Sequence, residues 1–93
     1  MSLTLEEIRA APKVLLHDHL DGGLRPATVI ELAQEIGYHK LPSADSDEVA
    51  RWLQRGAHRG HLNLYLDAFQ HTVAVMQTRE ALIRVAAECA EDL

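Results

Sequence analysis

The pattern of apolar positions divides the first twenty residues into a helix and a strand. Residues 3–11 have apolar side chains at helical spacing, and Thr4 is placed to cap the first turn, which carries two glutamates. Pro12 ends this helix. Residues 14–19 begin instead with three consecutive apolar side chains, which is typical of a strand buried on both faces. We therefore expect one short helix followed by one strand.

A second helix is expected over residues 26–36. Pro26 suits the first position of a helix, because its missing N–H would have no partner there, and Gly37 is a favoured carboxyl-terminal stop. The preceding pair, Gly22 and Gly23, lets backbone and ligand approach closely. The side chains expected on the buried face of this helix are Val29, Ile30, Ala33 and Ile36.

Three further helices complete the predicted pattern. The first begins at Asp45 or Ser46 and ends at Gly56, the second spans residues 62–77, and the third is capped by Thr78. Their apolar faces are formed, in order, by Val49, Trp52 and Leu53, by Tyr65, Phe69, Val73 and Met76, and by Ala81, Leu82, Val85, Ala86 and Cys89.

A lone strand determines the expected fold class. A buried strand needs neighbours for its backbone hydrogen bonds, and no second run of β-branched residues follows Gly22. The last helix also reaches residue 93 without a stop signal. We therefore expect residues 1–93 to be a single incomplete domain, the first βα unit of a larger α/β protein. Alone it should be mostly helical with at most one short strand, through whose free edges two copies can associate.

Composition narrows the possible functions. Hydrophobic residues make up 47% of the 93-residue chain and aromatic residues 4%, a balance that favours packed helices over a β-sandwich. The net charge of −5, without a basic cluster, argues against nucleic-acid binding. Neither a membrane span nor a secretory leader is expected. The single cysteine, Cys89, suits a reducing cytoplasm and is interpreted as a small buried helix residue.

The strongest chemical signal is the pair His17 and His19 at the end of the strand. Side chains two apart on a strand share a face, so both imidazoles can bind one metal ion, and neutral imidazole is a good ligand for Zn²⁺. The carboxyl end of a buried parallel strand is also where α/β proteins bind ligands. The other four histidines, expected at solvated positions, are His39, His58, His61 and His71.

The run of residues 13–22, with Arg25, Pro26 and Thr28 after it, resembles the amino-terminal part of adenosine deaminases. These are metal-dependent amidohydrolases built on an eight-stranded (β/α)8 barrel, also called a TIM barrel. The resemblance extends over residues 13–93. The His-x-His pair alone is common to many amidohydrolases, whereas the longer run that continues with Leu-Asp-Gly is much more specific.

The resemblance implies roles for individual residues. His17 and His19 would be two of the zinc ligands, and Asp21 would bind the ribose 5′-hydroxyl of a purine nucleoside. Aspartate at position 21, where related enzymes acting on the free base carry glutamate, favours adenosine over adenine. The residues of the helix after Gly60 that would line the purine pocket as a lid are Leu62, Tyr65 and Phe69. Tyr65 departs from the phenylalanine usual at its position.

The implied reaction is hydrolytic deamination of adenosine to inosine and ammonia. Zinc lowers the pKa of bound water toward neutrality, which supplies the nucleophile. In the family the remaining ligands and the proton donor come from later strands, so the 93-residue chain alone is expected to be inactive. Two alternatives stay open. One is an adenine or other aminopurine deaminase of the same superfamily, and the other is a helical module that binds zinc between two chains.

Overall fold

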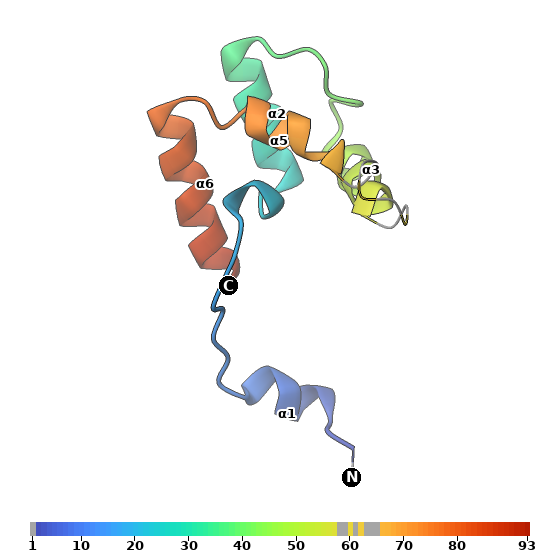
Figure 1. The fold of residues 1–93 in the computed structure, drawn as a ribbon, viewed down its shortest axis with the longest axis vertical. Helices are drawn as coiled ribbons and strands as arrows, with labels where there is room; N and C mark the ends of the chain where they lie inside the picture. Colours follow the sequence, from blue (N-terminus) through green and yellow to red (C-terminus); the bar gives the residue numbers. More distant parts are fainter. Residues whose placement is uncertain (1, 58–59, 61, 63–65) are drawn as a thin grey trace.

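The computed structural model describes residues 2–57, 60, 62 and 66–93, which are mostly helical and contain no strand (Figure 1). The elements are α1 (Leu5–Ala10), the 3-10 helix η1 (Leu20–Gly22), α2 (Pro26–Ile36), α3 (Ser46–Ala57), α5 (Phe69–Ala74) and α6 (Arg79–Asp92). This list confirms the expectation of a mostly helical chain. None of the helices in these ranges is long and apolar enough to cross a membrane.

The strand predicted over residues 14–19 does not form. The segment runs as an extended connection from α1 to η1, and His19 has the extended φ and ψ values of −118° and 119°. Val14 and Leu16 are 80% and 91% exposed. A strand is defined by hydrogen bonds to a neighbour, and the described part of this chain offers none. The backbone conformation suits a strand, but the pairing is missing.

Helix α1 is capped as predicted but stands apart from the other helices. The Glu7 N–H donates to Thr4 Oγ1 at 3.1 Å, which satisfies one of the free amide groups of the first turn. None of its residues is buried. Figure 1 shows α1 at the far end of the extended segment. Its stability therefore rests on local interactions rather than on packing.

The core lies between α2, the turn after α5, and α6. Both expected ends of α2 are confirmed: Pro26 stands in its first turn, and Gly37 adopts the left-handed φ of 71°. The buried cluster consists of Val29, Leu32, Ala33, Val75, Ala81 and Val85. Ile36, expected on the buried face, is 44% exposed, because it lies in the last turn of α2, beyond this cluster.

Helix α6 buries a narrower face than predicted. Thr78 caps it through the hydrogen bond from the Ala81 N–H to Thr78 Oγ1, at 3.0 Å, and Cys89 is buried as expected. Leu82 and Ala86, which were expected to face inward, are exposed. Among the described residues, the core cluster includes Ala81 and Val85 of α6, whereas the adjacent apolar row with Leu82 and Ala86 is exposed.

Helix α3 begins at the predicted cap and ends one residue beyond Gly56, at Ala57. The Asp47 N–H donates to Asp45 Oδ1 at 3.3 Å, and the Val49 N–H donates to the Asp45 carbonyl at 3.0 Å. Val49 is fully buried, whereas the other two predicted apolar positions, Trp52 and Leu53, are half-buried.

The single helix predicted over residues 62–77 is wrong. A turn at residues 67–68 precedes α5, and α5 ends before Val75. The predicted apolar face is also displaced, since Val73 is exposed and the polar side chains of His71 and Thr72 are buried. The prediction considered only the spacing of apolar residues. His71 and Thr72 can nevertheless be buried, because both make internal hydrogen bonds.

An ionic network joins the start of α2 to the end of α6. The Arg25 guanidinium donates to Asp92 at 2.9 and 3.0 Å and to Glu91 at 3.0 Å, and it lies 3.4 Å from Glu88. Arg84 pairs with Glu88 at 3.2 Å and also with Glu31 of α2. The carboxylates of Asp92 and Glu91, and to a smaller extent that of Glu88, hold the pKa of Arg25 above its ordinary range. The network fixes the loop between η1 and α2 against α6.

Candidate functional site

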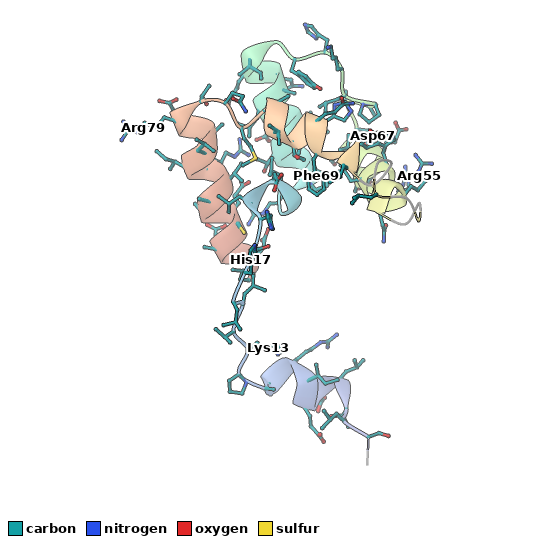
Figure 2. All side chains as sticks on the ribbon, viewed as in Figure 1. Lys13, His17, Arg55, Asp67, Phe69 and Arg79 are labelled. Atoms are coloured by element: carbon teal, nitrogen blue, oxygen red, sulfur yellow. The ribbon has the colours of Figure 1, made fainter. Side chains whose placement is uncertain are left out.

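The two histidines of the extended segment converge on one point. His17 and His19 are both exposed, their Nε2 atoms lie 3.0 Å apart, and their ring centroids are separated by 4.9 Å. Figure 2 shows His17 on the connection between α1 and η1. The extended backbone places both side chains on one face of the segment, as the sequence predicts.

This spacing fits a shared metal ion. Two imidazole nitrogens that bind one zinc ion tetrahedrally, with bonds of about 2.0–2.1 Å, lie roughly 3.3 Å apart. The observed separation of 3.0 Å between the Nε2 atoms is close to that value. Within the described ranges no group of three or more His, Cys, Asp or Glu side chains could hold a metal. The described residues thus bring two candidate ligands together, His17 and His19.

Asp18, between the two histidines, ties the segment to α6. Its Oδ1 accepts a hydrogen bond from the His19 N–H at 2.8 Å, and Cys89 Sγ lies 3.7 Å from its Oδ2. Burial, followed by the nearby Asp18 carboxylate, raises the pKa of the Cys89 thiol. A side chain at Gly23 would contact the same sulfur at 3.5 Å. Sequence reasoning did not assign this supporting role to Asp18 or Cys89.

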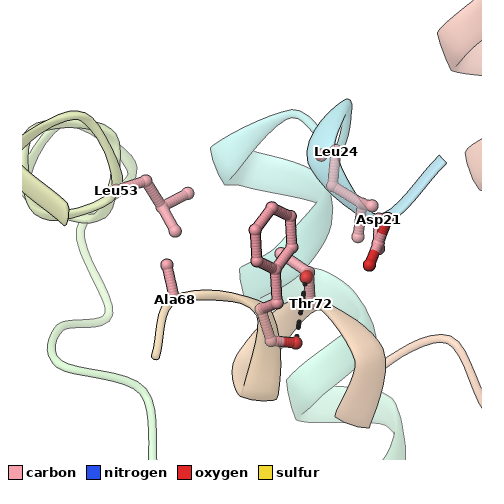
Figure 3. A pocket seen from close by; sticks show the side chains of 7 residues that line it. Asp21, Leu24, Leu53, Ala68 and Thr72 are labelled. Carbon is pink, nitrogen blue, oxygen red and sulfur yellow. Dashed lines mark hydrogen bonds between the residues drawn. The ribbon is translucent and has the colours of Figure 1, made fainter. Parts of the chain in front are cut away.

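A pocket opens next to η1, with Asp21 among the residues that line it (Figure 3). It has a volume of about 130 Å³, and the described residues that line it are Asp21, Gly22, Leu24, Leu53, Ala68, Phe69 and Thr72. A Cβ atom at Gly22 would lie 3.7 Å from the Phe69 ring, so the glycine allows η1 to approach α5 closely. A half-buried carboxylate at the edge of an apolar pocket is suited to orient a polar group of a ligand.

The structure brings together some of the predicted site residues. Asp21 and Phe69 line the same pocket, and the histidine pair precedes Asp21 by two to four residues. Leu62 is 69% exposed and does not line this pocket, and Tyr65 lies outside the described residues. Sequence reasoning missed Thr72, for which the apolar pattern held no signal.

Behind this pocket, His71 is buried rather than solvated, contrary to expectation. It is 6% exposed, and its Nδ1 lies 2.7 Å from the Tyr38 hydroxyl. The Trp52 ring meets it edge to face, with centroids 5.2 Å apart. Burial lowers the pKa of His71 below its ordinary value. Of the other histidines expected at solvated positions, His39 is exposed, and His58 and His61 lie outside the described residues.

Comparison with known proteins gives one consistent result. The family model described as adenosine deaminase matches residues 12–93. Adenosine deaminase 1 of Streptomyces coelicolor is 64% identical over 88 residues, which cover 95% of this chain and 22% of the relative. The adenosine deaminase of Mycobacterium tuberculosis is 62% identical over 90 residues, or 97% of this chain and 25% of the relative.

The relative from Mycolicibacterium gilvum, also an adenosine deaminase, is 63% identical over 91 residues, or 98% of this chain and 25% of the relative. The chain thus spans about a quarter of the length of the curated relatives it matches. No solved structure matches it.

Proposed function

We propose, on the premise that this chain belongs to the adenosine deaminase family, that a polypeptide carrying it together with the rest of the family's length deaminates adenosine to inosine and ammonia. The observation that carries the proposal is the converging histidine pair directly before the Asp21 pocket. A pair of metal ligands that lies two to four residues before a pocket-lining carboxylate is part of what a metal-dependent hydrolase needs.

In this proposal, residues 17–21 have two tasks. His17 and His19, whose Nε2 atoms lie 3.0 Å apart, would hold zinc, and Asp21 would accept a hydrogen bond from the ribose 5′-hydroxyl. When bound, zinc supplies activation of water as a nucleophile at neutral pH. Phe69 forms an apolar wall of the pocket, and the lid roles of Leu62 and Tyr65 stay predictions.

The exposed residues of the extended segment support a place in a barrel. Residues 14–19 already have an extended backbone, and the side chains of Val14 and Leu16 are exposed, so other strands or helices can pack against them. We propose that this segment becomes the first strand of a (β/α)8 barrel, with the histidines at its carboxyl end, where such barrels carry their sites. The further ligands and the proton donor would come from other strands, so the 93-residue chain alone should be inactive.

One observation favours a second candidate, a zinc site shared by two copies of the chain. The histidine pair is exposed, and the described residues provide no third ligand near it. Two such pairs related by a twofold axis would supply four nitrogen ligands in a tetrahedron. This arrangement would be a property of the 93-residue chain rather than of a complete deaminase.

A chimera tests the proposed function. The chain replaces the matching 88-residue segment of the Streptomyces coelicolor relative, and the formation of inosine from adenosine and of hypoxanthine from adenine is measured. We expect turnover of adenosine and little or none of adenine. A folded, metal-loaded chimera that prefers adenine would support the aminopurine alternative, and one that deaminates neither substrate would overturn the proposal. The unmodified relative is the control.

A further inference from the structure

The buried histidine behind the pocket has no part in the chemistry proposed so far. His71 lies on α5, two residues from Phe69 and next to Thr72, both of which line the pocket. Its own side chain instead contacts Tyr38, just after α2, and Trp52 of α3. One short helix thus presents two residues to the pocket and a third to the rest of the core.

The geometry around His71 favours a neutral ring. With Nδ1 only 2.7 Å from the Tyr38 hydroxyl, one of the two groups donates and the other accepts. If the hydroxyl donates to Nδ1, the ring must be neutral, with its proton on Nε2. No ion pair between His71 and a carboxylate occurs in the part of the chain that the structure describes. A protonated, positively charged His71 ring would therefore be buried without a negative charge beside it, which is unfavourable.

Helix α5 is too short to hold its position alone. It has six residues, and η1 packs on it through the Gly22 contact with Phe69. Thr72 Oγ1 donates to the Phe69 carbonyl at 3.2 Å, which fixes these two pocket residues relative to each other (Figure 3). The orientation of this pair toward Asp21 then depends on what anchors the other side of α5, and His71 is the polar anchor there.

We propose that His71 is a positioning residue: its neutral ring, bonded to Tyr38, fixes α5 so that Phe69 and Thr72 face Asp21, and protonation of His71 releases this wall of the pocket. The pocket then loses its shape in acid. As a statement about nucleoside binding, the inference rests on the proposed function. As a statement about α5 and the pocket wall, it stands on the contacts alone.

The charged groups near this cluster lie on its outer side. Glu48, Arg51 and Arg55 of α3 line a surface groove together with Trp52. Of the titratable groups with contacts to His71 in the described structure, the Tyr38 hydroxyl is the one that faces the ring from the α2 side.

Trp52 offers a direct readout, because it is the only tryptophan in the chain and its ring lies 5.2 Å from that of His71. We expect its fluorescence in the full 93-residue chain to fall in one transition centred below pH 6.5, as the imidazolium forms. His71→Gln should abolish this transition. A transition that persists in His71→Gln, or its absence in the parent chain while the circular dichroism stays native, would overturn the proposal.

Tyr38→Phe provides a second variant that keeps the ring packing. Loss of a hydroxyl that donates to Nδ1 removes support for the neutral ring, so the fluorescence midpoint should move to higher pH by about half a unit. A shift to lower pH would contradict the assigned donor direction and with it the proposal. His39→Gln, which changes an exposed histidine, is the matched control and should leave the midpoint unchanged.

Movement of the pocket wall is measured separately by NMR on the full chain. The amide signals of Gly22, Phe69 and Thr72 should shift with the same midpoint as the His71 ring, and those of Thr4 and Glu7 in α1 should not. If the amide signals of these pocket residues do not change with the His71 titration, the proposal is overturned.

Kinetics of the chimera provide a further test. The KM for adenosine should rise about threefold or more as the pH falls through this range, and His71→Gln should remove that rise. An inactive chimera would count against the proposed function only, because the NMR titration still decides the role of His71.

Discussion

At the scale of single residues, aspartate 21 carries the most specific part of the proposed function. It lines the pocket beside Phe69, whereas the Nε2 atoms proposed to bind the metal belong to His17 and His19. Its proposed partner is the ribose 5′-hydroxyl, so its role can be separated from that of the metal ligands by the choice of substrate.

We expect Asp21→Ala in the chimera to lower kcat/KM for adenosine by about 10- to 100-fold, the loss of a charge-assisted hydrogen bond of about 1.5–3 kcal/mol. The loss should shrink for 5′-deoxyadenosine, which lacks the hydroxyl. Steady-state kinetics with the two substrates measure the difference. Equal losses on both would show that Asp21 supports the loop or the metal site instead.

Two titratable groups, the buried His71 and the half-buried Glu88, give the chain a predictable dependence on pH. Burial lowers the pKa of His71, so the unfolded state takes up a proton first, and stability falls as pH drops below about 6.5. The hydrogen bond from Thr28, at 2.5 Å, and then the one from Arg84 lower the pKa of Glu88. Its contribution is present above about pH 4.5 and is lost as pH falls through the lowered pKa.

Urea unfolding at a series of pH values checks this prediction. The free energy of unfolding should decline in two separate stages as pH falls. His71→Gln should remove the stage below about pH 6.5, and Glu88→Gln should remove the more acidic one. A decline near neutrality that survives in His71→Gln would show that another group is responsible.

At the scale of elements, local signals in the sequence were reliable and long-range ones were not. The caps at Thr4 and Thr78 and the stop at Gly37 depend on a few neighbouring residues, and all three are confirmed. The strand predicted over residues 14–19 needs pairing that the described residues do not provide, and the burial of His71 depends on Tyr38, 33 residues away. Apolar spacing cannot reveal a polar side chain that is buried with its partner.

The two threonine caps offer a matched comparison. Each hydroxyl accepts from the N–H three residues on, at 3.1 Å for Thr4 and 3.0 Å for Thr78, but only the helix capped by Thr78 packs into the core. Thr78→Ala should lower the free energy of unfolding by about 1 kcal/mol. Thr4→Ala should change it by a few tenths at most, because α1 has no buried residue. Equal effects in chemical denaturation would contradict the separation of α1 from the core.

At the scale of the whole molecule, several large apolar residues and the histidine pair are exposed in the described structure. Val14, Leu16, Leu82 and Ile83 are exposed although they are large and apolar. The sequence predicted an incomplete domain because its expected strand had no partner, and this stays a prediction. The curated relatives that the chain matches are about four times as long. The barrel could be inferred only from the family resemblance, because the described residues form no strand.

The 93-residue chain itself should associate when zinc is added. Two exposed pairs of His17 and His19 can complete one tetrahedral site between two copies. Sedimentation velocity should show a dimer with one zinc ion for two chains, and a chelator should reverse it. His19→Ala should stay monomeric, whereas His39→Ala should behave as the parent. A chain that remains monomeric at saturating zinc would exclude the shared site.

The central claim is that residues 17 and 19 supply two of the metal ligands of an adenosine deaminase, and zinc content together with activity in the chimera tests it most directly. The parent chimera should retain one zinc ion per polypeptide and deaminate adenosine. His17→Ala and His19→Ala should lose both zinc and turnover, whereas His39→Ala should keep both. Full zinc content and adenosine turnover in His17→Ala or His19→Ala would contradict the claim.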